Sequence, residues 1–296
     1  MSPATSQPVF IIGGSRTGST MLQTILSTSP EVCLVDELQF RSRSWIRRDL
    51  VSDIDAHVGP LDQAGALDRL MDLLYSGIPD GYFWSNAERL LDRDMLYKEL
   101  SDRPLDIRTL FDAIITVRAR MKGKKRIGAK FPMHYSFTPQ LLEWYPDCKL
   151  IHTTRNPKAV YASQAAKYLK PEQGWATKAS TRFKQFIHIN IQISWTARLH
   201  QQLRDLPNYQ LVRYEELVLE PEAEIRRLCE FIEIDFRPEM LLPKQFGSSF
   251  KDIGNDNRGI DRSSLEKWRT AISGFTAKTI DILHRRAFRN LGYDND

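Results

Sequence analysis

The chain has 296 residues, of which 42% are hydrophobic, and a formal net charge of +5. It is long enough for one large or two small domains with a substantial core, and its basic excess favours an anionic ligand. The cysteines, Cys33, Cys148 and Cys229, lie far apart, without a CxxC pair or a histidine at metal-ligand spacing. This pattern argues against a disulfide framework or a zinc site.

The N-terminal sequence lacks a charged segment followed by a long apolar one, and no run reaches the roughly 18 apolar residues that a spanning helix needs. We expect a soluble, cytoplasmic protein with no membrane span, unless a native anchor has been removed. Basic residues are dispersed apart from Lys122–Arg126, and no RNP-like motif is present. We therefore expect no binding to nucleic acid.

The first predicted elements are a strand, a tight loop and a helix. Pro8–Gly14 is a β-branched and aromatic run that ends in glycines, which is typical of a buried strand. Ser19 or Thr20 can cap the helix that follows, and Ser29-Pro30 ends it. Val32–Val35 predicts a second short strand, followed directly by two carboxylates, Asp36 and Glu37.

Residues 39–125 have a different sequence pattern. Charged helical segments are broken by glycine and proline, and an aromatic run, Tyr82-Phe83-Trp84, lies among them. Such a segment between strand units predicts a helical insertion or lid that takes part in ligand binding. Packing of those aromatic residues in a core explains the pattern equally well.

Strands and helices alternate again after this segment. The predicted strands are Arg126–Phe131, Cys148–Thr154 and Tyr209–Arg213, and the predicted helices are Thr138–Tyr145, one opened by Asn156-Pro157, about 180–206, one after Pro221 and one from Thr276. This alternation predicts one α/β domain over 1–296, with a mostly parallel central sheet covered by helices on both faces and with the helical insertion.

The first loop nearly matches the phosphate-binding pattern GxxxxGK[ST], with Gly13 and Gly18 in register and Thr20 at the hydroxyl position. Ser19 stands where a nucleotidase has lysine, which weakens the case for a kinase-like phosphotransferase, although that alternative stays open. Backbone N–H groups and the helix N-terminus can still bind a phosphate. A cation, Arg16, lies within the loop.

Arg16-Thr17-Gly18-Ser19-Thr20 resembles the 5′-phosphosulfate loop of sulfotransferases that use 3′-phosphoadenosine 5′-phosphosulfate (PAPS). A second motif, Arg155-Asn156-Pro157 with Ser163 eight residues after the arginine, is similar to the part of that family's site that holds the 3′-phosphate. Guanidinium and hydroxyl donors suit such a monoester. The resemblance runs from residue 8 to about 270 and is weakest across 39–125.

Two further cofactor contacts are implied by the resemblance. Tyr214-Glu-Glu-Leu217 matches an element whose tyrosine lies near the adenine. Arg258, beside Gly259, lies in a stretch similar to the loop that closes over the cofactor, although the spacing departs from that of the cytosolic enzymes. A solvated loop arginine is an equal alternative for Arg258.

The family resemblance also implies the catalytic groups of sulfuryl transfer, whose demands should resemble those of phosphoryl transfer. Arg16 would neutralise charge on the leaving phosphate, and Lys130 would contact the sulfuryl group, unless it is a surface lysine at a strand end. The expected base is Glu37, where related bacterial enzymes have a glutamate, unless it is a strand-end carboxylate paired with an arginine, and Asp36 is a possible substitute. The cytosolic enzymes use a histidine at the position of Pro132, so His134 is the alternative base.

The resemblance therefore implies a three-layer, P-loop-like α/β fold and a PAPS-dependent sulfotransferase that needs no metal and releases 3′-phosphoadenosine 5′-phosphate. Its acceptor would be a small molecule, carbohydrate, lipid or peptide with a hydroxyl or amine, and the insertion 39–125 would take part in binding it. These motifs do not distinguish among such acceptors.

Overall fold

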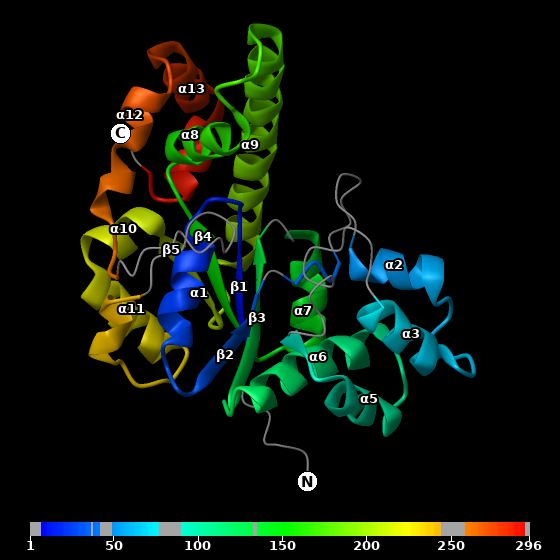
Figure 1. The fold of residues 1–296 in the computed structure, drawn as a ribbon. Helices are drawn as coiled ribbons and strands as arrows, with labels where there is room; N and C mark the ends of the chain where they lie inside the picture. The colour runs from blue at the N-terminus through cyan, green and yellow to red at the C-terminus, as the bar shows by residue number, and fades with distance from the viewer. Residues whose placement is uncertain are drawn as a thin grey trace. The chain divides into compact units, whose positions relative to one another are not determined.

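The computed structural model describes residues 7–36, 38–41, 49–76, 90–132, 135–243 and 258–293. Five strands form a sheet in the order β2-β3-β1-β4-β5 (Figure 1). Their bounds are β1 Val9–Gly13, β2 Val32–Val35, β3 Arg126–Pro132, β4 Lys149–Thr154 and β5 Tyr209–Arg213. The β2–β3 and β4–β5 pairs are parallel. All five strands predicted from the sequence are therefore present, and the mostly parallel α/β fold is confirmed.

The chain divides into two compact units. The first unit comprises Met1–Ile11 and Leu26–Lys149, and the second comprises Ile12–Ile25 and Leu150–Asp296. The boundary passes through β1, so the loop after this strand belongs to the second unit.

In the first unit, the segment predicted as an insertion contains four described helices: α2 Leu50–His57, α3 Ala66–Tyr75, α5 Arg93–Ser101 and α6 Ile107–Met121. Aspartates cap three of them, and Asp49, Asp92 and Asp106 accept hydrogen bonds from the N–H groups of Ser52, Met95 and Thr109 at 2.9, 2.8 and 2.6 Å. Helix α6 packs against β2 and β3, so this part of the segment covers the sheet. Its role in acceptor binding stays a prediction.

Aromatic side chains form the core of the first unit. Phe111 of α6 lies at the centre, with its ring centroid 6.0 Å from that of Phe10, 5.0 Å from Phe40 and 5.8 Å from Phe137. Trp144, from helix α7 (Thr138–Trp144), adds a further edge contact to Phe137 at 5.5 Å. These separations are those of favourable edge and tilted aromatic pairs, which add to the burial energy of the rings.

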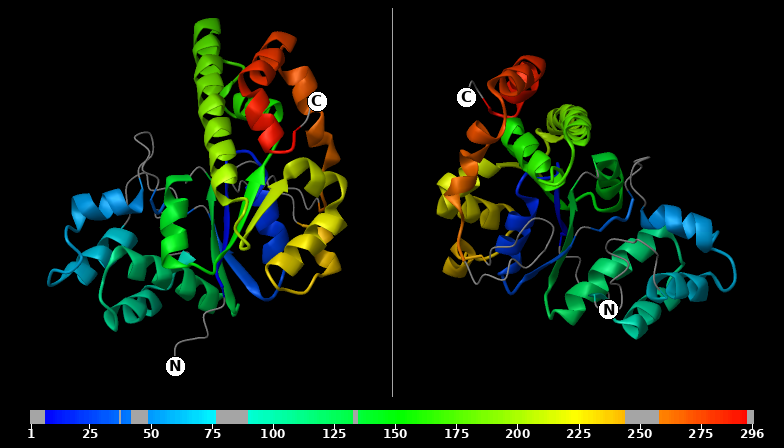
Figure 2. Two further views of the ribbon diagram at one scale, coloured as in Figure 1. Left: turned by 180° about the vertical axis from the view of Figure 1, so that it is seen from behind. Right: turned by 45° about the horizontal axis from the view of Figure 1, so that its top comes forward.

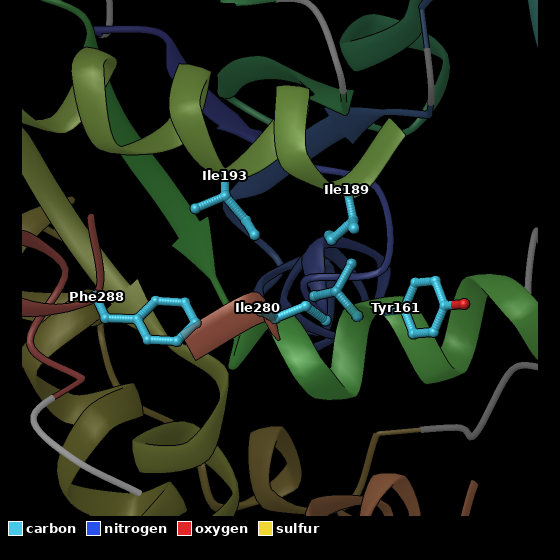
Figure 3. Close-up of a cluster of buried hydrophobic side chains, with 6 residues drawn as sticks. Tyr161, Ile189, Ile193, Ile280 and Phe288 are labelled. Carbon is cyan, nitrogen blue, oxygen red and sulfur yellow. The ribbon is translucent and has the colours of Figure 1, made fainter. Parts of the chain in front are cut away.

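The second unit consists of helices around β4 and β5. They are most of α1 Ser19–Ser27, then α8 Pro157–Tyr168, α9 Trp175–Leu203, α10 Tyr214–Leu219, α11 Pro221–Phe231, α12 Lys267–Ala271 and α13 Gly274–Asn290. Helices α8, α9 and α13 lie side by side in both views of Figure 2 and pack against one another. Their shared core contains Tyr161, Ile189, Ile193, Ile280 and Phe288 (Figure 3). None of the helices in the described ranges is long and apolar enough to cross a membrane.

A buried histidine on β4 predicts a pH dependence of stability. His152 Nδ1 lies 2.8 Å from the hydroxyl of Tyr209, whereas its Nε2 has no hydrogen-bond partner in the described structure. Burial lowers the pKa of His152 to about 3. An unfolded histidine titrates near 6.5, so the unfolded chain binds more protons between pH 6.5 and 3, and stability falls as the pH decreases through this window.

We expect urea unfolding to show this loss between pH 7.5 and pH 5, at up to about 1.4 kcal/mol per pH unit for a single group. The variant His152→Phe, which keeps a ring but cannot titrate, should have a flatter profile over the same range. Parallel profiles for the two proteins would show that His152 does not contribute.

Candidate functional site

The loop between β1 and α1 has a conformation suited to binding an anion. Gly13 and Gly18 have φ angles of +143° and +91°, and Arg16 also has a positive φ, of +70°. The first bond inside α1 runs from the Leu22 N–H to the Gly18 carbonyl at 3.0 Å. The N–H groups of residues 19–21 therefore lie before the first i→i−4 hydrogen bond of the helix. Groups in this position attract phosphate or sulfate.

Thr17 attaches this loop to β4. Its hydroxyl donates to the Gly14 carbonyl at 2.8 Å and lies 2.8 Å from the Thr153 hydroxyl. Thr17 and Ser19 are both buried. We infer that the two hydroxyl residues shape the loop, in addition to any contact with a ligand.

Arg16 and Ser163 lie together although 147 residues separate them in the sequence. Arg16 Nε donates to Ser163 Oγ at 2.9 Å. The sequence motifs assigned Ser163 to a phosphate site around Arg155, but the hydrogen bond here goes to the arginine of the first loop. In this structure Ser163 therefore belongs to the surroundings of Arg16.

Arg155 and Tyr214 form the second part of the cluster. The Arg155 guanidinium carbon lies 4.1 Å from the centroid of the Tyr214 ring, and Arg155 Nη2 donates to the Ser264 carbonyl at 2.8 Å. Arg155 Nε is buried without a hydrogen-bond partner in the described structure. A buried guanidinium donor without an acceptor is costly, and an anion would relieve the cost.

Tyr214 connects Arg155 to the first loop. A Cβ atom built on Gly18 would lie only 2.4 Å from Tyr214 Cδ2, so the ring rests directly against the loop backbone. The Tyr214 hydroxyl lies 2.7 Å from Ser264 Oγ. Position 18 therefore has to be glycine, both for its φ angle and for the close approach of the ring.

The residues next to Arg155 and Tyr214 hold these side chains in place. Asn156 Oδ1 accepts from the Lys158 N–H at 2.9 Å, which confirms the predicted cap of α8. Glu215 accepts from the Asn156 N–H at 2.9 Å and from the Tyr293 hydroxyl at 2.8 Å. Burial raises the Tyr293 pKa, so this hydroxyl stays a donor. The Tyr214-Glu215 pair after β5 was the available signal for this role of Glu215, which the sequence analysis missed.

A C-terminal segment completes the cluster, and sequence reasoning did not single out its contact residue, Ser264. This residue lies in a short 3₁₀ helix, Arg262–Leu265, which is attached by a hydrogen bond of 2.8 Å from Arg262 to the Leu219 carbonyl. Arg258 is exposed, and its contact with a 3′-phosphate stays a prediction.

Of the three residues predicted to take part in the chemistry from the first unit, the structure describes only Lys130. Lys130 lies on β3 and is fully buried, so the alternative of a surface lysine at a strand end is wrong. Glu37 and His134 lie outside the described residues. In the described ranges no three His, Cys, Asp or Glu side chains gather as they would around a metal ion.

The sequence matches a known protein family and several curated proteins. The model described as "Sulfotransferase family" matches residues 8–238. An uncharacterized protein of Aquifex aeolicus is 26% identical over 299 residues, and the omega-hydroxy-beta-dihydromenaquinone-9 sulfotransferase of Mycobacterium bovis is 26% identical over 258. The alignments cover 96% and 80% of this chain but only 33% and 65% of these relatives, so the chain is considerably shorter than either.

Two solved structures share the fold over nearly their whole length. The sulfotransferase domain of the Synechococcus PCC 7002 olefin synthase has a TM-score of 0.59, with 100% of this chain and 99% of that one covered. The sulfotransferase domain from the curacin biosynthetic pathway has a TM-score of 0.58, with 98% and 99% covered. Both are 19% identical to this chain, so the likeness establishes the fold.

Proposed function

The chain belongs to the sulfotransferase family, whose model matches residues 8–238. We propose from this premise that it transfers the sulfuryl group from PAPS to an acceptor hydroxyl or amine. The observation that carries the proposal is the single contact network that includes both anion-binding arginines. Arg16 bonds to Ser163, and Arg155 lies over Tyr214, whose ring rests against the loop that contains Arg16.

The residues of this network fit a nucleotide with phosphate on both sides of its ribose. The loop N–H groups and Arg16 would hold the 5′-phosphosulfate, and Arg155, whose Nε has no partner among the described residues, would hold the 3′-phosphate. Tyr214 would lie beside the adenine, and Ser163 and Arg258 would add donors. No metal is needed in this scheme, because side chains and backbone N–H groups meet the charge of the donor.

The transfer itself would be an in-line displacement. The acceptor oxygen or nitrogen forms a bond to sulfur as the bond from sulfur to the 5′-phosphate oxygen breaks, and 3′-phosphoadenosine 5′-phosphate leaves. Arg16 would neutralise the charge that grows on the leaving phosphate, and Lys130, as a buried cation, would contact the equatorial sulfuryl oxygens. The acceptor proton would pass to a base, for which Glu37 is the first candidate and His134 the second.

The kinase-like alternative is not favoured. A P-loop kinase uses a lysine that reaches the β- and γ-phosphates, and Ser19 occupies that position here. The donor that this site suits has no γ-phosphate.

The acceptor is proposed at the level of chemical class. The mycobacterial relative is named for an ω-hydroxyl on a lipid quinone. We propose a small molecule with a hydroxyl group, lipids included, as the first class to screen with labelled PAPS. Carbohydrate and peptide acceptors would form the comparison sets.

We also propose that the protein works in the cytoplasm. Cys33, Cys148 and Cys229 are buried, and none of these three described residues forms a disulfide. Cysteines that remain as thiols support a protein that works in a reducing compartment such as the cytoplasm.

Thermal unfolding tests the proposed donor. At millimolar concentration, 3′-phosphoadenosine 5′-phosphate should raise the Tm by several degrees, because a ligand that binds only the folded state at 100 times its Kd adds about 2.7 kcal/mol. ATP and adenosine 5′-monophosphate are the controls and should have much smaller effects. Equal shifts for ATP and the bisphosphate, or none for either, would contradict the proposal.

The choice of base is tested by two variants. Glu37→Gln should lower kcat about 100-fold or more while the Kd of 3′-phosphoadenosine 5′-phosphate stays within a factor of about two, because general-base catalysis contributes roughly 10²- to 10⁴-fold. His134→Ala should have a small effect on both quantities. The opposite pattern of turnover would transfer the role of base to His134.

A further inference from the structure

A buried amide on α9 contacts the backbone of the anion-binding loop. Gln192 is 3% exposed, and its Nε2 donates to the Ser15 carbonyl at 2.9 Å. A Cβ atom built on Gly14 would lie 2.1 Å from the same nitrogen. The amide group therefore fits directly against the Gly14-Ser15 backbone, and a larger residue at position 14 would displace it.

Two further side chains fix the orientation of this amide. Gln192 Oε1 accepts from Gln164 Nε2 of α8 at 3.2 Å, and Gln164 Oε1 lies 3.0 Å from His188 Nδ1. An amide oxygen has no hydrogen to give, so His188 Nδ1 has to be the donor in the last contact. Each of the three residues therefore donates toward the loop, and Gln192 Nε2 stands at the end of the chain.

The hydrogen bond to Ser15 determines how one peptide unit of the loop is turned. The Ser15 carbonyl belongs to the same planar, trans peptide as the Arg16 N–H, and the two groups point in opposite directions. With the carbonyl held against α9, the Arg16 N–H points away from α9. A rotation of this peptide by half a turn would bring a carbonyl oxygen in place of the N–H and would repel an anion.

The backbone at Arg16 shows why this peptide needs support. Its φ of +70° is a left-handed conformation, which is unfavourable for an L residue that has a side chain. Rotation of the Ser15-Arg16 peptide changes that angle, so the loop has an alternative that releases this cost. The bond from Gln192 opposes the rotation.

We propose that Gln192 is a positioning residue that holds the Ser15-Arg16 peptide in its anion-binding orientation, with Gln164 and His188 as its support. The inference rests on the proposed function, since the anion is the 5′-phosphosulfate of the donor. Gln192 acts through the peptide and need not touch the nucleotide. Its effect is on the donor and leaves acceptor recognition unchanged.

The variant Gln192→Glu tests this role because it retains the shape of the side chain. A carboxylate has no hydrogen to donate and would face the Ser15 carbonyl oxygen, whereas a protonated carboxyl group can donate to it. We expect the Kd of 3′-phosphoadenosine 5′-phosphate, measured by calorimetry, to be about 10- to 100-fold weaker than wild type at pH 8. The ratio of variant to wild-type Kd should shrink severalfold at pH 5.5, and using the ratio removes the titration of the phosphates themselves.

A second variant tests the same role if Gln192→Glu does not fold. Gln164→Met leaves the Gln192 amide in place but removes its hydrogen-bonded neighbour, and it should raise the KM for PAPS about 3- to 10-fold with an unchanged KM for the acceptor. A general loss of structure would affect both KM values and lower the Tm. Circular dichroism and the Tm of each variant are recorded first.

The outcomes separate the two proposals. If the wild-type protein does not bind 3′-phosphoadenosine 5′-phosphate, the proposed function fails. If the wild type binds but Gln192→Glu, or Gln164→Met where that variant is the one that folds, has wild-type donor affinity, the role of Gln192 is refuted. A weakened Gln192→Glu whose ratio to wild type is the same at pH 8 and pH 5.5 also counts against it, because a donor at this position would then be irrelevant.

Discussion

Replacement of Arg155 by alanine is expected to weaken the binding of 3′-phosphoadenosine 5′-phosphate by about 100-fold, because a charge-assisted hydrogen bond contributes roughly 1.5–3 kcal/mol and Arg155 can form more than one. Its Nη2 is used by the Ser264 carbonyl, while its buried Nε has no acceptor within the described structure. Adenosine 5′-monophosphate lacks the 3′-phosphate, so its affinity should fall only severalfold. Calorimetric titration of both nucleotides measures the difference.

The matched control is Arg155→Lys, which retains the charge but loses the planar group that stacks on Tyr214 at 4.1 Å. We expect an intermediate loss for the bisphosphate. If Arg155→Ala weakens both nucleotides by the same factor, Arg155 supports the fold of the site and does not bind the 3′-phosphate.

Replacement of Arg16 by alanine is expected to lower kcat by about 10²- to 10³-fold, the usual cost of removing one group that stabilises transition-state charge. The loss should exceed the loss in donor affinity, because negative charge on the bridging oxygen grows only as the bond to sulfur breaks. Single-turnover kinetics at saturating PAPS would separate the chemical step from binding and product release.

The neighbouring variant Ser163→Ala serves as the control for Arg16. It removes the acceptor of the 2.9 Å bond from Arg16 Nε and leaves the charge in place. We expect a kcat reduced by less than about tenfold, from looser positioning of the guanidinium. A Ser163→Ala variant as slow as Arg16→Ala would show that the position of Arg16 matters more than its charge.

The sequence predicted the regular elements of the sheet well, because short runs with β-branched or aromatic residues, bounded by glycine or proline, mark the strands locally. The helices were predicted less completely, as three examples show. Helix α9 begins at Trp175, about five residues before the predicted start, with Gly174 as its N-cap. Helix α10 follows β5 without a connecting loop, and α12 has only five residues. Helices as short as α10 and α12 contain too few residues for a helical period to be detected in the sequence.

The candidate site was predicted residue by residue from two motifs, whereas its internal contacts were not. The partner of Arg16 is Ser163, and the carbonyl that receives Arg155 belongs to Ser264, which is 109 residues further along the chain. Such pairs depend on how distant elements pack, and no local pattern encodes them. The predictions for Glu37 and His134 remain open because both residues lie outside the described ranges.

The position of Tyr214 between the loop and Ser264 has a consequence for how the protein would respond to a protease. One tyrosine touches the nucleotide loop with its ring and the segment Arg262–Leu265 with its hydroxyl. If the contact of Arg262–Leu265 with Tyr214 strengthens nucleotide binding, then bound nucleotide must stabilise that contact by the same free energy, because coupling between two binding events is reciprocal. Cleavage by trypsin after Arg262 should therefore slow when the nucleotide is bound, so limited digestion would report occupancy without an acceptor or a turnover assay.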